Sequence, residues 1–144
     1  MKVTALGTSL LCFAFLSAHA QTPSEPEFTY DKCLKEHGTV NNAVVEGCSN
    51  MASDELKRDI TKHYQSIYKR LLVLESPEEA KKFEASQKAW LQYRNLHCDL
   101  EGRYIGGPRY AYCPMLENLE RAQQLRTLDT MIKNVEKARA EWEK

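Results

Sequence analysis

Apolar side chains recur every three or four positions along most of this chain, and this spacing constrains its fold more than any other feature. A period near 3.6 places such residues on one face of an α-helix, and no segment alternates convincingly as a strand would. The repeating positions are Leu56, Ile60, Tyr64, Ile67, Leu71 and Leu74, then Ala80, Phe83, Trp90 and Cys98, with the polar Gln87 and Arg94 on the same face, and finally Leu116, Leu119, Leu125, Leu128, Ile132 and Val135. We therefore predict an all-α fold, a small bundle of three long helices.

The predicted helix starts follow from capping signals. Ser76 is a typical N-cap, Pro77 suits the first helical position, and Glu79 completes a capping box. Ser53 is expected to cap the first long helix in the same way, and Pro114 is expected to restart the helix for the third.

One or two short helices are expected before the long ones. Residues 28–37 form a helical candidate that ends at Gly38, and Asn41 and Asn42 are suited to cap a second short helix that reaches Met51. The residues before them, 21–27, include two prolines and no apolar side chain, which predicts a flexible leader. Residues 28–144 are then one helical domain.

The first 20 residues have the features of a cleavable secretory signal. Lys2 supplies a positive charge, an apolar stretch covers residues 6–16, and Ala-His-Ala at 18–20 matches the small-x-small cleavage pattern. The stretch is too short to span a bilayer, and no later segment approaches that length. We predict a periplasmic or secreted protein with no membrane insertion; the alternative is a buried N-terminal helix.

Cleavage after Ala20 leaves an even number of cysteines, because Cys12 is removed with the signal. In an exported chain, four cysteines favour disulfide bonds. Their positions favour Cys33–Cys48 and Cys98–Cys113, each closing a loop of 15 residues and each worth roughly 3 kcal/mol in the chain-entropy model. The alternative pairs the first cysteine segment with the second and ties distant helices together.

Charge and motifs exclude several classes of function. The whole chain has 20 basic and 20 acidic residues; without the signal, which carries one lysine and no acid, its net charge is −1. This balance argues against nucleic-acid binding. The sequence contains no nucleophile elbow, HExxH or phosphate-binding glycine loop, so we predict no enzyme and no cofactor. His37, His63 and His97 lack zinc-like spacing to the cysteines, so we predict no metal site.

The segment between Cys98 and Cys113 is the strongest candidate for binding. Its three glycines and one proline predict a loop that interrupts the helices. Tyrosine and arginine are enriched in binding hot spots, and a disulfide at the base lowers the entropic cost of ordering a loop on a partner. The alternative is that the tyrosines pack over one end of the bundle. The candidate residues are Arg103, Tyr104, Arg109, Tyr110 and Tyr112.

Arg94 is the one charged residue on a helix face that is otherwise apolar except at Gln87. It lies one turn after Trp90 and one turn before Cys98. Because burial of an unpaired charge is costly, we expect an ion pair with a carboxylate on a neighbouring helix, such as Asp59 or Asp31. The alternative is a ligand-binding role.

These residues together resemble a known family. The segment QKAWLQYRNLHC, with Gln87, Trp90, Arg94 and Cys98, matches the Q-x-x-W-x-x-x-R-x-x-x-C core of the lysozyme inhibitor LprI-like family of secreted and periplasmic bacterial proteins. The resemblance covers residues 30–128 and includes Glu120-Arg121. It differs at position 95, where the family often has Asp after the arginine, and at Pro108, where the family has a small polar residue. We assign structural roles to Trp90, Arg94 and Arg121.

The resemblance implies a helical, disulfide-bonded binding protein without catalysis, and suggests lysozyme as its partner. Inhibition would then occur by occlusion of the enzyme's cleft, led by Tyr104, Arg109 and Tyr110. The near-neutral charge adds little steering toward lysozymes, which are commonly basic. The alternative function is an envelope interaction protein for another client, such as a secretion component, a toxin or a cell-wall enzyme. The oligomeric state is left open.

Overall fold

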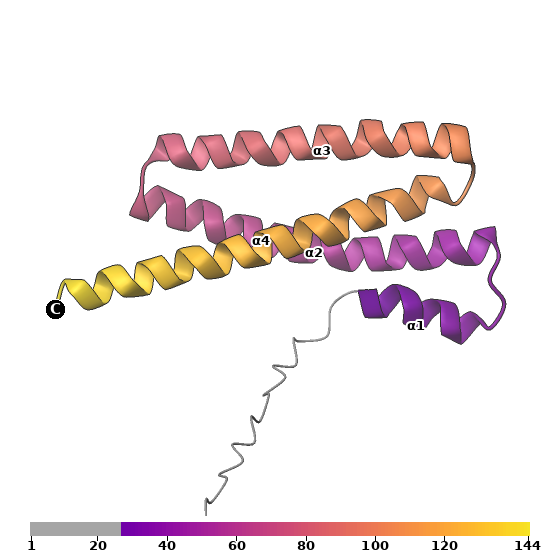
Figure 1. Cartoon of the computed structure of the whole chain (residues 1–144), viewed down its shortest axis with the longest axis horizontal. Helices are drawn as coiled ribbons and strands as arrows, with labels where there is room; N and C mark the ends of the chain where they lie inside the picture. Colours follow the sequence, from indigo (N-terminus) through magenta and orange to yellow (C-terminus); the bar gives the residue numbers. More distant parts are fainter. Residues whose placement is uncertain (1–26) are drawn as a thin grey trace, which may run out of the picture.

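The computed structural model describes residues 27–144, which form four helices (Figure 1). They are α1 (Glu27–His37), α2 (Asn42–Leu74), α3 (Pro77–Ile105) and α4 (Arg109–Trp142). One short and three long helices confirm the predicted all-α bundle. None of the described helices is both long and apolar enough to cross a bilayer. The predicted signal peptide, Cys12 and all of the predicted leader except Glu27 lie outside the described residues.

The three long helices run alternately up and down, and α1 folds back along the first half of α2 (Figure 1). As a result, the α1–α2 and α3–α4 connections lie at one end of the bundle, and the α2–α3 connection lies at the other. The most extensive packing is between α2 and α4. The buried core is formed by Ala52, Leu56, Ile60, Ile67, Phe83, Met115, Ala122 and Leu125.

Three of the predicted helix boundaries are confirmed. Gly38 ends α1 with φ = 67°, a left-handed conformation that favours glycine. The side chain of Asn41 accepts a hydrogen bond from the Val44 N–H at the start of α2. Ser76 caps α3 in the same way, with Pro77 in the first turn.

Other predicted boundaries are wrong. The predicted short helix does not end at Met51 and Ser53 caps no helix, because α2 is continuous from Asn42 to Leu74 and both residues lie inside it. The predicted loop between Cys98 and Cys113 is also wrong: α3 continues to Ile105, the connection is only residues 106–108, and α4 has already begun at Arg109. Pro114 therefore lies inside α4 rather than at its start.

Both predicted disulfides are confirmed, and the alternative pairing is wrong. Cys33–Cys48 joins α1 to the start of α2, and Cys98–Cys113 joins the end of α3 to the start of α4. The Cα–Cα distances are 5.6 and 5.5 Å, which are typical of disulfides. Each bond therefore cross-links a helical hairpin, and the turns of both hairpins lie at the same end of the bundle (Figure 1).

A buried carboxylate joins α2 to α4 further along the bundle. Asp129 is only 1% exposed, and it accepts hydrogen bonds from Ser66 (2.7 Å) and Lys133 (2.7 Å). The Nδ1 atom of His63 lies 2.9 Å from the same carboxylate and Nε of Arg70 lies 3.9 Å from it, while Nε2 of the His63 ring lies 3.3 Å from Asp59. Burial raises the pKa of Asp129, but the hydrogen bonds from Lys133, Ser66 and His63 outweigh it and lower the pKa to about 2.

This carboxylate predicts a loss of stability in acid. Asp129 has its ordinary pKa of 3.8 when unfolded and about 2 when folded, so its contribution is complete above pH 4 and is lost as the pH falls from about 4 to 2. Asp129→Asn should therefore cost about 2 kcal/mol at pH 7 and flatten the acid dependence. Urea unfolding at several pH values measures both effects.

Asp54→Asn is the matched control for this experiment, because Asp54 is exposed and, within the part of the chain that the structure describes, its ion pair is with Lys57. It should change the free energy of unfolding by less than about 0.5 kcal/mol. An equal loss in the two variants would contradict the assignment.

Candidate protein-binding site

The QKAWLQYRNLHC motif lies on α3, and each of its four characteristic residues contacts a residue of α4. Gln87 accepts a hydrogen bond from Nε of Arg121 at 2.9 Å. The Trp90 ring contacts two guanidinium groups, those of Arg94 and Arg121, at 5.3 and 5.6 Å from the ring centroid. Cys98 forms the disulfide to α4. These positions support the structural roles proposed for Trp90, Arg94 and Arg121.

The expected carboxylate partner of Arg94 is wrong. Its Nη1 atom donates to the amide oxygen of Asn118 on α4 at 2.7 Å, and its Nε and Nη2 atoms donate to the Asn95 amide oxygen. Asp59 instead lies beside His63 and Arg126. Burial lowers the pKa of Arg94, and the nearby charge of Glu117 opposes that shift.

Asn118 extends this contact to a third helix. It is fully buried, and its amide nitrogen donates to the hydroxyl of Ser53 on α2 at 2.7 Å. A single chain of hydrogen bonds thus runs from Arg94 on α3 through Asn118 on α4 to Ser53 on α2. Asn118 is not among the residues predicted from the sequence; a polar residue between the apolar positions Met115 and Ala122 was the available signal.

Of the predicted binding residues, three lie on an exposed surface and two are engaged within the fold. We call residues 103–110 the α3–α4 tip. On it, Tyr104 is 82% exposed and Tyr110 is 54% exposed, and Arg103 is exposed beside Asp99. Arg109 pairs with Glu101 at 3.2 Å and lies over the ring of Tyr112, which is partly buried.

The tip is held firmly although it contains two glycines. Gly106 has φ = 111°, a conformation that favours glycine, and its carbonyl accepts the N–H of Arg109. The ring of Tyr110 on α4 packs directly on Gly102 of α3, where no side chain would fit. The disulfide Cys98–Cys113 closes the base. The tip therefore presents its exposed side chains without a long loop to order.

The charged groups beneath the tip are paired with each other. Arg103 donates to Asp99 at 2.7 Å. Glu101 faces both Arg109 and the ring of His97, which lies 3.4 Å away and is also near Glu117. Because these charges largely cancel, the tip offers mainly aromatic and apolar contact area rather than a strong field.

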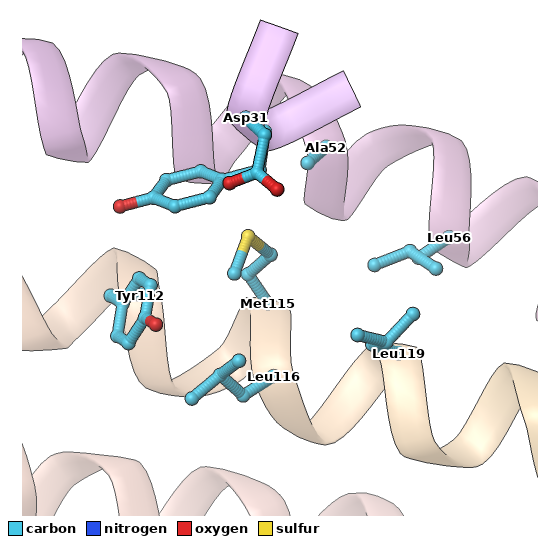
Figure 2. Close-up of a pocket in the computed structure, with 8 residues that line it drawn as sticks. Asp31, Ala52, Leu56, Tyr112, Met115, Leu116 and Leu119 are labelled. Atoms are coloured by element: carbon cyan, nitrogen blue, oxygen red, sulfur yellow. The ribbon is translucent and has the colours of Figure 1, made fainter. Parts of the chain in front are cut away.

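A cavity of about 90 Å³ lies beside the tip, between α1, α2 and α4 (Figure 2). Tyr30 and Tyr112 form one wall, with ring centroids 5.4 Å apart. Burial, and then the charges of Tyr112 and Asp31, raise the pKa of Tyr30. The other lining residues are Asp31, Ala52, Leu56, Met115, Leu116 and Leu119.

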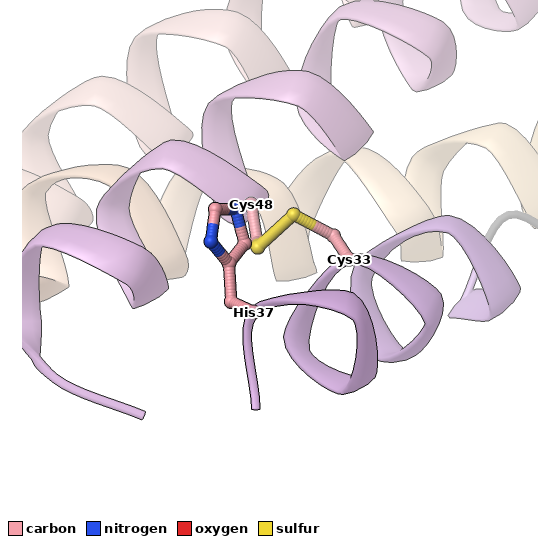
Figure 3. Close-up of side chains that lie close together, drawn as sticks. All are labelled: Cys33, His37 and Cys48. Carbon is pink, nitrogen blue, oxygen red and sulfur yellow. A yellow bond between two sulfur atoms is a disulfide. The ribbon is translucent and has the colours of Figure 1, made fainter. Parts of the chain in front are cut away.

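Among the described residues, two groups of side chains lie close enough to hold a metal ion, but each includes disulfide-bonded sulfur. Cys33, Cys48 and His37 form one group (Figure 3), and His97, Glu101 and Cys113 form the other. The thiolate is the form that binds metal, and the bonded sulfur atoms offer none. Neither group therefore fits a metal ion while the disulfides are intact.

Comparison with known proteins identifies the family. The family model described as lysozyme inhibitor LprI matches residues 33–125, more than half of the chain. The matched range includes all four described cysteines, the hydrogen-bond chain and the tip. No curated protein and no solved structure matches the chain significantly.

The hydrogen-bond chain predicts a large cost for removing its central amide. Asn118→Leu retains much of the volume but leaves Arg94 and Ser53 without their shared partner, so we expect a loss of about 2–4 kcal/mol in unfolding free energy. Asn95→Ala removes exposed contacts of the same guanidinium and should cost less than about 1 kcal/mol. Urea unfolding distinguishes the two, and equal losses would contradict the central role of Asn118.

The packing of Tyr110 predicts that a Gly→Ala substitution lowers the stability at one glycine and leaves it almost unchanged at another. Gly102→Ala places a methyl group against the Tyr110 ring and should cost about 1–3 kcal/mol. Gly107→Ala meets open space and should change the stability by less than about 0.5 kcal/mol. Thermal unfolding measures both, with near-UV circular dichroism reporting on the tyrosine. A neutral Gly102→Ala would show that the ring moves away easily.

Proposed function

Because the chain belongs to the lysozyme inhibitor LprI family, we propose that it is an exported binding protein without catalytic activity that inhibits lysozyme by covering the enzyme's cleft with its α3–α4 tip. The secretory features of residues 1–20 and the two disulfides support export. The partner is then met in the periplasm or outside the cell.

The exposed and rigid tip is the observation that carries this proposal. Tyr104 is the most exposed of the tip's aromatic residues, and exposed aromatic side chains on a preorganised turn are typical of binding hot spots. The adjoining Ile105 is 64% exposed and enlarges the apolar area. Tyr112 and Arg109, which pack against each other, would support this surface rather than lead the contact.

The paired charges beneath the tip suit contact with an enzyme cleft. Arg103 and Arg109 each have a carboxylate within the same hairpin, so binding would not bury an unpaired arginine. Burial of such a charge would otherwise oppose association.

A turbidity assay with the purified mature protein tests the proposal. Lysis of bacterial cells by lysozymes of several types should slow as the protein is added, and Tyr104→Ala should reduce its potency by about tenfold. The matched control is Tyr93→Ala, on the same helix and 53% exposed but away from the tip.

The control should inhibit like the unmodified protein. Undiminished lysis at micromolar protein against every lysozyme type would refute lysozyme inhibition and favour another envelope client. Equal losses in the two tyrosine variants would instead refute the assignment of the contact to the tip.

A further inference from the structure

The cavity between α1, α2 and α4 combines an apolar interior with one carboxylate. Ala52, Leu56, Met115 and Leu119 line it, and all but Leu119 are buried core residues. In Figure 2 the carboxylate of Asp31 is directed toward the space above Met115. A ligand that fits must therefore bring an apolar stem together with a polar or charged end.

The size of this cavity limits the ligand to a single side chain. Sites for small molecules and cofactors usually measure about 300–1,000 Å³, whereas this cavity measures about 90 Å³. A saccharide unit or a cofactor would not fit. One amino-acid side chain from a partner protein is of the appropriate size.

The charge of Asp31 selects the type of side chain. Within residues 29–144, the exposed carboxylate of Asp31 has no hydrogen bond and no ion pair, although its neighbour Lys32 pairs with Glu36. Arg109, which lines the adjoining hollow with Tyr30, is already paired with Glu101. An unpaired carboxylate beside apolar surface complements lysine and arginine, whose methylene stems pack on apolar groups while their cationic ends remain polar.

The cavity also adjoins the tip. Tyr30 and Tyr112 separate it from a more open hollow that Val45, Pro108 and Arg109 complete. A protein that covers Pro108 and Arg109 at the tip would thus lie next to the two tyrosines that line the cavity.

We propose that this cavity receives a lysine or arginine side chain of the partner protein, with Asp31 as its counter-ion. The proposal rests on the proposed function in taking the partner to be a protein that binds at the tip. It adds a second, charge-selective contact to the aromatic one.

Binding to a lysozyme that the unmodified protein inhibits provides the first test. Asp31→Asn removes the counter-ion and Leu116→Trp fills the mouth of the cavity; each should raise the Kd about tenfold. Glu46→Gln removes an exposed carboxylate outside the cavity and should leave the Kd unchanged. Equal effects of Asp31→Asn and Glu46→Gln would overturn the proposal, and circular dichroism checks that each variant is folded.

A second test needs no lysozyme, so the proposal can fail or succeed separately from the proposed function. Butylguanidinium, an arginine side-chain analogue, is titrated into the isotope-labelled mature protein and followed by NMR. Shifts should be concentrated at Asp31, Met115 and Leu116, and should be lost in Asp31→Asn and Leu116→Trp. Butanol, which has the same stem without the charge, should shift these signals far less.

Any of three results of the NMR experiment would overturn the proposal. The first is the absence of cavity shifts at high millimolar butylguanidinium, and the second is equal shifts with butanol. The third is a set of contacts, without any ligand, between Met115 and residues 21–26, which would place this chain's own leader in the cavity.

Discussion

The arrangement of the bundle depends on the hydrogen-bond chain from Arg94 through Asn118 to Ser53. Apolar side chains on helices tolerate sliding and rotation, because their contacts are not directional. A buried amide does not, because a donor or acceptor that loses its partner costs free energy. Since Asn118 contacts both neighbouring helices, α2, α3 and α4 are aligned at one level.

The same chain determines where the tip lies. Arg94 and Cys98 are one turn apart on α3, so the amide contact and the disulfide hold α3 and α4 together at successive levels below residues 103–110. The hydrogen-bond contact between Arg94 and Asn118 and the exposed tyrosines therefore belong to one hairpin, with the contact near its middle and the tyrosines at its end. The motif residues fix the position of the tip by holding α3 and α4 together, and they do not form part of its exposed surface.

The helices and disulfides could be predicted from the sequence because their signals are local. Apolar spacing, the caps at Asn41 and Ser76, and the two intervals of 15 residues between cysteines each act within a short stretch. The wrong predictions concern residues whose type suggests a local role, whereas their role in the structure is a contact with another helix. Ser53 resembles a cap but accepts a hydrogen bond from Asn118, and Gly102 resembles a helix breaker but makes room for Tyr110. Such pairs, like Asp129 with Ser66, depend on helix alignment, which periodicity does not specify.

Both disulfides lie at one end of the molecule, so its two ends differ in their resistance to local unfolding. The end that holds the tip is cross-linked twice, whereas the α2–α3 connection is held by non-covalent contacts such as those of Arg139 with Leu74 and Glu75. Local opening starts where few constraints act. Outside the cell, where proteases meet partly opened chains, we expect cleavage to begin at the uncross-linked end and to leave each disulfide-stapled hairpin intact.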